Sequence, residues 1–104
     1  DIYWKNLKGE WLGVNSRGAE SLKQMGFINN VDDVIGKSDY EIFNKETADI
    51  YRKNDLEVIT KETEIAHEET VALTNGRSKV QLSTKRPIWD KNGNVIGIVG
   101  NTID

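Results

Sequence analysis

A few charged and polar residues in segments predicted to be ordered carry the strongest chemical signal in this sequence. Asp55 falls on the apolar face of a predicted helix, and Glu69 and Lys85 each fall inside a predicted strand. The same strand segments also contain His67, Gln81 and Ser83. A buried, unpaired ammonium or carboxylate is costly, so these groups should pair or meet a ligand. Two interpretations follow: a self-satisfied ion network linking helix to sheet, or a pocket for a small polar or charged metabolite with Lys85 as its anchor.

The residue types offer no catalytic or metal-binding constellation. The chain has no cysteine and a single histidine, His67, so thiolate sites, cysteine nucleophiles and histidine pairs are absent from the sequence. Glu68 and Glu69 are adjacent on a strand and point to opposite faces. Asp32 and Asp33 precede a helical turn, where acids favour the N-terminal dipole. No phosphate-binding glycine motif occurs. We therefore expect no enzymatic activity and no metal site, and we expect neither haem nor flavin because the residues give no specific signal for either.

The length and net charge of the sequence indicate how many domains it forms and which partners it lacks. The 104 residues suit one domain spanning residues 1–104, which we interpret as a fragment of a longer chain. Fourteen Lys and Arg against 17 Asp and Glu give a net charge of −3. That balance predicts neither a nucleic-acid partner nor direct membrane contact. No apolar run is long enough to span a membrane.

Hydrophobic periodicity and turn residues predict a short series of elements. We expect strands at 2–7 and 10–14, helices at 17–25, 31–35 and 45–61 with a short helix capped by Ser38 or Asp39 between them, and strands at 64–73, 79–89 and 94–103. Helices clustered between two groups of hairpin-linked strands indicate an α+β domain, with helices on one face of an antiparallel sheet.

Four segments in this order resemble a PAS domain of bacterial signalling proteins. YWKNLKGEWLGVN (3–15) is similar to the opening hairpin and IGKSDYEIF (35–43) to the Gly-Lys-Ser/Thr-Asp segment. YRKNDLEVI (51–59) is similar to the long helix, and STKRPIWDKNGNVIGIVGNTID (83–104) to the closing hairpin of the PAC region. Asn6 stands where the family commonly has Asp, and either residue can support the turn.

The resemblance implies a five-stranded antiparallel sheet in the order 2-1-5-4-3, with helices over one face that can enclose a cavity. Matching residue by residue puts candidate ligand-binding side chains of the strands at Tyr3, Lys5, His67, Glu69, Gln81, Ser83 and Lys85. It also puts Leu12 and Val14 on the cavity side. These positions are what the family implies, and the spacing alone does not give them. The apolar face of the predicted 45–61 helix adds Tyr51 and Asp55 as candidates.

The facing of the two central hairpin strands has two alternatives. A strict two-residue turn at Asn75-Gly76 would pair Val71 with Val80 and turn Gln81 and Lys85 outward. The register implied by the family needs a longer turn, with Val71 opposite Gln81. A shift of one residue reverses every side chain, so the register decides whether Lys85 is buried.

The expected role is a non-catalytic sensory module that regulates a histidine kinase or cyclic-dinucleotide enzyme in the same parent chain. The alternative is a ligand-free dimerisation or docking module. Trp4, Val80 and Leu82 would then form an apolar outer sheet face, which together with flanking helices predicts a homodimer. The resemblance favours a cytoplasmic location, whether or not the parent is attached to a membrane.

Overall fold

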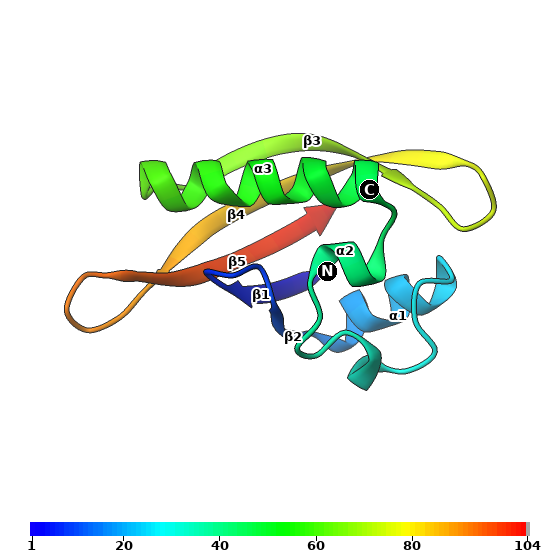
Figure 1. The fold of residues 1–104 in the computed structure, drawn as a ribbon, viewed down its shortest axis with the longest axis horizontal. Coiled ribbons are helices and arrows are strands. Elements are labelled where there is room, and N and C mark those ends of the chain that lie inside the picture. Colours follow the sequence, from blue (N-terminus) through cyan, green and yellow to red (C-terminus); the bar gives the residue numbers. More distant parts are fainter. Residues whose placement is uncertain (104) are drawn as a thin grey trace.

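A computed structural model describes residues 1–103 as one antiparallel sheet with helices on a single face (Figure 1). The strands are β1 (Ile2–Asn6), β2 (Trp11–Val14), β3 (Ile65–Ala72), β4 (Ser78–Trp89) and β5 (Val95–Ile103). Their spatial order is β2-β1-β5-β4-β3, as the resemblance implied. β1 and β5 pair at the centre of the sheet, which brings the two ends of the described chain side by side.

The helical segment between β2 and β3 forms α1 (Ser16–Gln24), the 3₁₀ turn η1 (Val31–Asp33), α2 (Asp39–Ile42) and α3 (Lys45–Lys61). Side-chain caps begin two of these helices. Asn15 accepts a hydrogen bond from the Gly18 amide at α1, and Asn44 accepts one from the Thr47 amide at α3. Predicted and observed boundaries agree within two residues, and those of α3 are identical.

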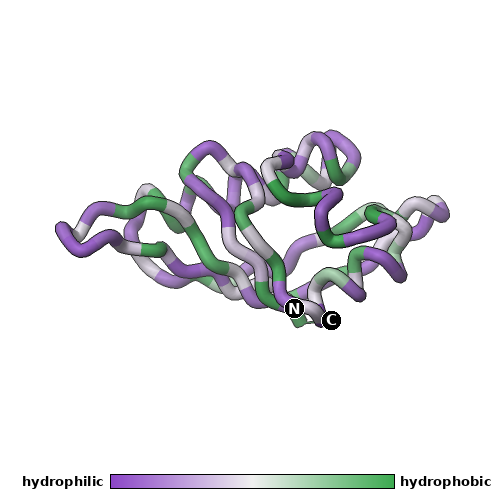
Figure 2. The backbone as a smooth tube through the Cα atoms, turned by 90° about the horizontal axis from the view of Figure 1, so that it is seen from below, coloured by the Kyte–Doolittle hydropathy of each residue, from purple (hydrophilic) through white to green (hydrophobic). Residues whose placement is uncertain are grey.

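α3 lies along β3 and β4, whereas α1 and α2 lie toward β1 and β2 (Figure 1). The buried residues of α3 recur at helical spacing at Thr47, Ala48, Tyr51, Asp55 and Val58. The hydropathy along the strands alternates, and the tip of the β4–β5 hairpin is hydrophilic (Figure 2). The helix layer and the inner sheet face therefore enclose the core between them.

The hairpin of β3 and β4 closes through a three-residue turn. The Leu73 amide donates to the Arg77 carbonyl at 2.7 Å, and Gly76 adopts a φ of 84°. Val71 therefore opposes Lys79, and Gln81 opposes Glu69. The expected pairing of Val71 with Gln81 is wrong by two residues, but an even shift keeps each side chain on its expected face.

One position on the first hairpin differs from expectation. Lys5 pairs with Trp11 and Trp4 with Gly13, so Leu12 is the extra residue of a bulge. Leu12 is 51% exposed, whereas Trp11 is buried. The prediction that Leu12 faces the cavity is therefore wrong, and Trp11 points inward instead. Val14 lies opposite Tyr3 and does line the cavity.

None of the helices in residues 1–103 combines the length and apolar character needed to cross a membrane.

Candidate functional site

Two buried lysines lie at the centre of the domain, each between two carboxylates. The Nζ of Lys5 on β1 lies 2.7 Å from Oδ2 of Asp39 and 2.9 Å from Oδ2 of Asp55. The Nζ of Lys85 on β4 lies 2.9 Å from Oδ1 of Asp55 and 2.6 Å from Oε2 of Glu69. All five side chains are at most 3% exposed. Asp55 on α3 therefore bridges both ammonium groups.

A neutral donor closes each end of this arrangement. The indole Nε1 of Trp11 donates to Oδ1 of Asp39 at 2.8 Å, and Nδ2 of Asn54 donates to Oε2 of Glu69 at 2.9 Å. We call the resulting series the ion chain; its members in order are Trp11, Asp39, Lys5, Asp55, Lys85, Glu69 and Asn54. Each of its carboxylates meets two donors, which limits the desolvation cost of burial. The ion chain links β1, β2, α2, α3, β3 and β4.

Neighbouring charges hold three members of the ion chain, Asp55, Lys5 and Lys85, in the ionised state. Burial by itself raises the pKa of Asp55, but the Lys5 and Lys85 ammonium groups outweigh burial and hold that pKa below its usual range. Burial likewise lowers the pKa of each lysine. Asp55 and Asp39 around Lys5, and Asp55 and Glu69 around Lys85, more than compensate and raise it.

Aromatic rings surround the Lys5 ammonium. Its Nζ lies 5.2 Å from the centre of the Tyr3 ring, 5.3 Å from that of Trp11 and 5.7 Å from that of Tyr51. These distances are within the range of cation–π attraction. Phe43 packs edge-on against Tyr51, with the ring centres 5.1 Å apart. The rings thus shield the ammonium from water and add to its stabilisation.

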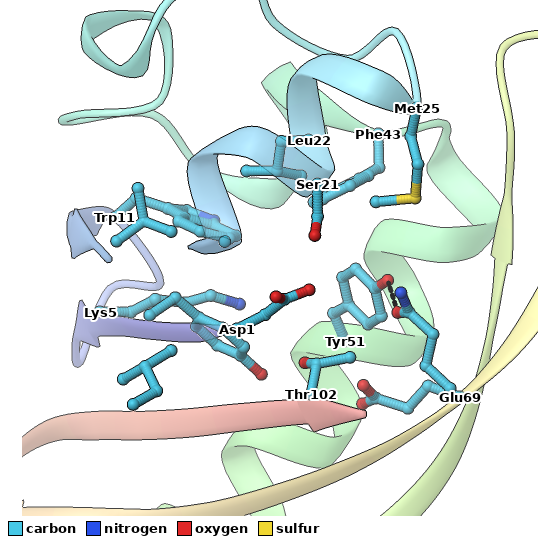
Figure 3. A pocket seen from close by; sticks show the side chains of 15 residues that line it. Asp1, Lys5, Trp11, Ser21, Leu22, Met25, Phe43, Tyr51, Glu69 and Thr102 are labelled. Carbon is cyan, nitrogen blue, oxygen red and sulfur yellow. Dashed lines mark hydrogen bonds between the residues drawn. The ribbon is translucent and has the colours of Figure 1, made fainter. Parts of the chain in front are cut away.

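A cavity of about 50 Å³ lies between α1 and the inner sheet face (Figure 3). Leu22 of α1, Met25 directly after that helix and the ring of Phe43 form part of its wall. The polar part of the wall comes from Asp1, Tyr3, Lys5, Ser21, Tyr51, Glu69, Gln81 and Thr102. The cavity therefore joins an apolar helix surface to one edge of the ion chain.

The structure brings together most of the residues that the sequence singled out. Tyr3, Lys5, Tyr51, Glu69 and Gln81 line the cavity. The hydroxyl of Tyr51 donates to Oε1 of Gln81 across a long 3.5 Å, which leaves both groups available for stronger hydrogen bonds (Figure 3).

Four other candidates lie outside the cavity wall. Asp55 and Lys85 are interior members of the ion chain, so Lys5, rather than Lys85, is the lysine that reaches the wall. Ser83 lies 3.3 Å from the Thr102 hydroxyl. Nε2 of His67 lies 3.4 Å from Oε1 of Glu57 on the outer part of α3.

Sequence reasoning missed Asp39 and Trp11 as members of the site. Asp39 belongs to the Gly-Lys-Ser-Asp segment on which the resemblance partly rested. The sequence therefore showed the motif, but it did not show that the Asp39 carboxylate pairs with Lys5. That carboxylate reaches Lys5, which is 34 positions away in the chain. Trp11 was missed because the bulge at Leu12 reverses the expected facing of the strand residues before it, whereas Val14 after it keeps its expected facing.

The chain belongs to the PAS family: the family model described as PAS fold matches residues 2–104. A search of curated proteins gave no match. Similar solved structures include the PAS domain of BvgS from Bordetella pertussis, at 25% identity and a TM-score of 0.77 over 99% of this chain and 74% of that one. A sensory box sensor histidine kinase from Vibrio cholerae matches at 18% identity and a TM-score of 0.73, covering 99% of this chain and 76% of that one.

VqmA from Vibrio cholerae, solved with a ligand and DNA, matches at 22% identity and a TM-score of 0.81. The match covers 100% of this chain but 46% of that one, so the chain spans about half the length of VqmA. These likenesses and the family match identify a PAS sensory domain, a class that is itself non-catalytic.

Proposed function

We propose that this domain binds a small polar ligand in the cavity beside α1 and passes the resulting change to an output domain of the same parent chain. The observation that carries the proposal is the cavity itself. It joins apolar helix residues to polar side chains of the sheet, next to charges that are already satisfied. Pre-formed cavities with an apolar wall and a few placed polar groups are typical ligand sites.

The cavity volume limits the size of the ligand. One water needs roughly 10–15 Å³ by this measure, so a cavity of about 50 Å³ holds about three to five waters. A ligand that displaces them has a similar number of non-hydrogen atoms. At no more than about 1.5 kcal/mol per atom, its Kd would be micromolar or weaker. Such a ligand reports metabolite levels in that range and exchanges rapidly.

We propose a histidine kinase or a cyclic-dinucleotide enzyme as the output domain. Support comes from the likeness to a sensor histidine kinase. The likeness to VqmA raises DNA binding by another part of a parent chain as a competing outcome. The net charge of −3 gives this domain no basic surface of its own for it. A cytoplasmic location belongs to the same proposal.

Native mass spectrometry of the purified chain tests ligand binding, and denaturing mass spectrometry identifies anything released. A small molecule bound at one copy per chain is the expected result. If no molecule co-purifies, a thermal-shift screen at high metabolite concentration follows, since weak ligands are lost on purification. Failure of every metabolite to stabilise the protein would contradict ligand sensing.

The second candidate function is ligand-free dimerisation through the surface that we call the outer face. It comprises exposed apolar side chains on the sheet surface opposite the helices: Ile2, Trp4, Leu12, Val80, Leu82 and Ile103. Ile103 and Val80 are the most exposed of these, at 58% and 57%. Exposed apolar side chains gathered on one sheet face are typical of a contact with another subunit or helix.

A further inference from the structure

The ion chain carries a net negative charge. It contains two ammonium groups, Lys5 and Lys85, and three carboxylates, Asp39, Asp55 and Glu69. Among residues 1–103, two carboxylate-bearing side chains line the cavity: Glu69, as a member of the ion chain, and Asp1, which is half-buried. Figure 3 shows the Asp1 carboxylate pointing into the cavity, toward Ser21 and Tyr51. The electrostatic environment therefore opposes entry of an anion.

The Lys5 ammonium at the cavity wall is already paired with two carboxylates. Lys5 is the one cationic side chain among the described residues of the wall. Its ammonium contacts the carboxylates of Asp39 and Asp55. Drawing it toward a ligand carboxylate would leave two buried carboxylates undercompensated, which is a strongly unfavourable exchange. The described side chains of the cavity wall thus include no cation that is free to anchor an anionic ligand.

A cationic ligand is disfavoured for a different reason, namely the presence of the Lys5 ammonium at the cavity wall. The wall contains the aromatic rings of Tyr3, Trp11, Phe43 and Tyr51, and the Lys5 ammonium already lies near three of them, Tyr3, Trp11 and Tyr51. A second cation in the cavity would also lie close to Lys5 in surroundings of low polarity, where like charges repel strongly. The Glu69 carboxylate is itself paired with Lys85.

Neutral hydrogen-bonding groups complete the wall. Burial raises the pKa of the Tyr3 and Tyr51 hydroxyls far above the physiological range, so both remain protonated and able to donate. The Gln81 amide and the hydroxyls of Ser21 and Thr102 also line the cavity. Groups of this kind can donate and accept hydrogen bonds without contributing charge.

We infer that the cavity is selective for small uncharged polar molecules that carry both a hydrogen-bond donor and an acceptor, and that it rejects carboxylates and organic cations of the same shape. This inference rests on the proposed ligand-binding function and specifies its chemistry. The acceptor of the ligand would face the tyrosine hydroxyls and Lys5, and its donor would face Glu69 and the Gln81 carbonyl.

Three probes of nearly identical shape test the charge selectivity: acetamide, acetate and acetamidinium. Each is titrated into the isotope-labelled 104-residue chain at constant ionic strength, with the indole N–H resonance of Trp11 as the reporter. Trp11 lines the cavity, whereas Trp4 and Trp89 are exposed elsewhere and serve as internal controls. We expect acetamide to shift the Trp11 resonance saturably, with a Kd at least tenfold lower than that of either ion.

The possible results distinguish the inferred charge selectivity from the proposed ligand binding. A Kd ratio below tenfold for acetate or acetamidinium would overturn the charge selectivity while leaving a ligand-binding cavity in place. If none of the three probes shifts the Trp11 resonance saturably, the result would contradict ligand binding in this cavity. The inferred charge selectivity would then be wrong as well.

A pair of variants tests the electrostatic cause directly. Asp1→Asn removes one negative charge from the cavity wall without touching the ion chain. Glu46→Gln removes the same charge from an exposed position on α3. We expect Asp1→Asn to strengthen acetate binding at least threefold and to change acetamide binding less than twofold. Glu46→Gln should change neither. Equal acetate affinities in the two variants would contradict the proposed role of charge.

Discussion

At the residue scale, the ion chain makes each of its charges depend on its neighbours. Lys85 is fully buried, so replacing it by methionine leaves Glu69 with one neutral donor and Asp55 with Lys5 alone. Losing one partner from a buried pair costs about 3–5 kcal/mol. We expect Lys85→Met to lower the free energy of unfolding, measured by urea denaturation, by about that amount.

The double variant Lys85→Met/Glu69→Leu serves as the matched control for this prediction. It removes the stranded carboxylate together with the ammonium, and it should therefore be more stable than the single variant. A loss below about 1 kcal/mol in Lys85→Met, typical of an exposed pair, would contradict the interior role of the ion chain.

The pKa shifts of the same residues predict how stability depends on pH. The depressed pKa of Asp55 contributes stability that is present above the unfolded value of about 3.9 and is lost as pH falls through the folded value. The raised pKa values of Lys5 and Lys85 contribute stability that is present below about 10.4 and is lost as pH rises through the folded values. We expect a plateau of stability between these limits.

Urea denaturation across about pH 2–12, in about one-unit steps, measures this profile. Asp55→Asn should flatten the acid side relative to the parent chain, because the amide that replaces the carboxylate does not titrate. An acid limb of the same steepness in both proteins would show that other carboxylates determine the acid dependence.

At the element scale, the contact between β1 and β5 depends on a glycine. A Cβ on Gly97 would collide with the backbone carbonyl of Lys5, which no side-chain rotation can relieve. Because Lys5 on β1 is also a member of the ion chain, displacing β1 would disturb the site as well. We expect Gly97→Ala to cost at least about 2 kcal/mol of stability by overpacking.

Gly13→Ala gives the comparison for that prediction. A Cβ on Gly13 would meet the ring of Trp4, a partly exposed side chain on the outer face that can rotate away. Its cost, measured by thermal unfolding alongside Gly97→Ala, should be the smaller of the two. The reverse order would mean that β1 and β5 can separate more easily than the Trp4 ring can move.

At the scale of the whole molecule, the helices cover one face of the sheet and leave the other to the exposed apolar side chains of the outer face. If this surface mediates dimerisation, Val80→Glu should abolish concentration-dependent association by burying a charge at the contact. Leu56→Glu places the same charge at an exposed position on α3 and should have no effect. Sedimentation from micromolar to near-millimolar concentration measures both, and identical association in the two variants would exclude the outer face.

Local patterns in the sequence were sufficient for the secondary structure but not for the facing of β3 and β4. Alternation along β3 and β4 left two facings open, because a strand has a side-chain period of two. The PAS resemblance favoured the facing that the structure has for Glu69, Gln81 and Lys85. It did not give the register, since the three-residue turn ending at Gly76 shifts the pairing by two positions without changing which face is buried. The alternation of apolar and polar residues gave no sign of the bulge at Leu12, so the facing of Leu12 and Trp11 was predicted wrongly.

By itself, the sequence determined the α+β class, the helix and strand positions, the PAS resemblance and the presence of charges that had to be paired. Only the tertiary structure decided which charges pair. Lys5 meets Asp39 and Asp55 across 34 and 50 positions of chain, and Lys85 occupies the interior of the ion chain while Lys5 reaches the cavity. Periodicity depends on near neighbours in the chain. Pair selection among buried charges depends on distances of a few ångströms between elements, which are set by packing of the whole domain.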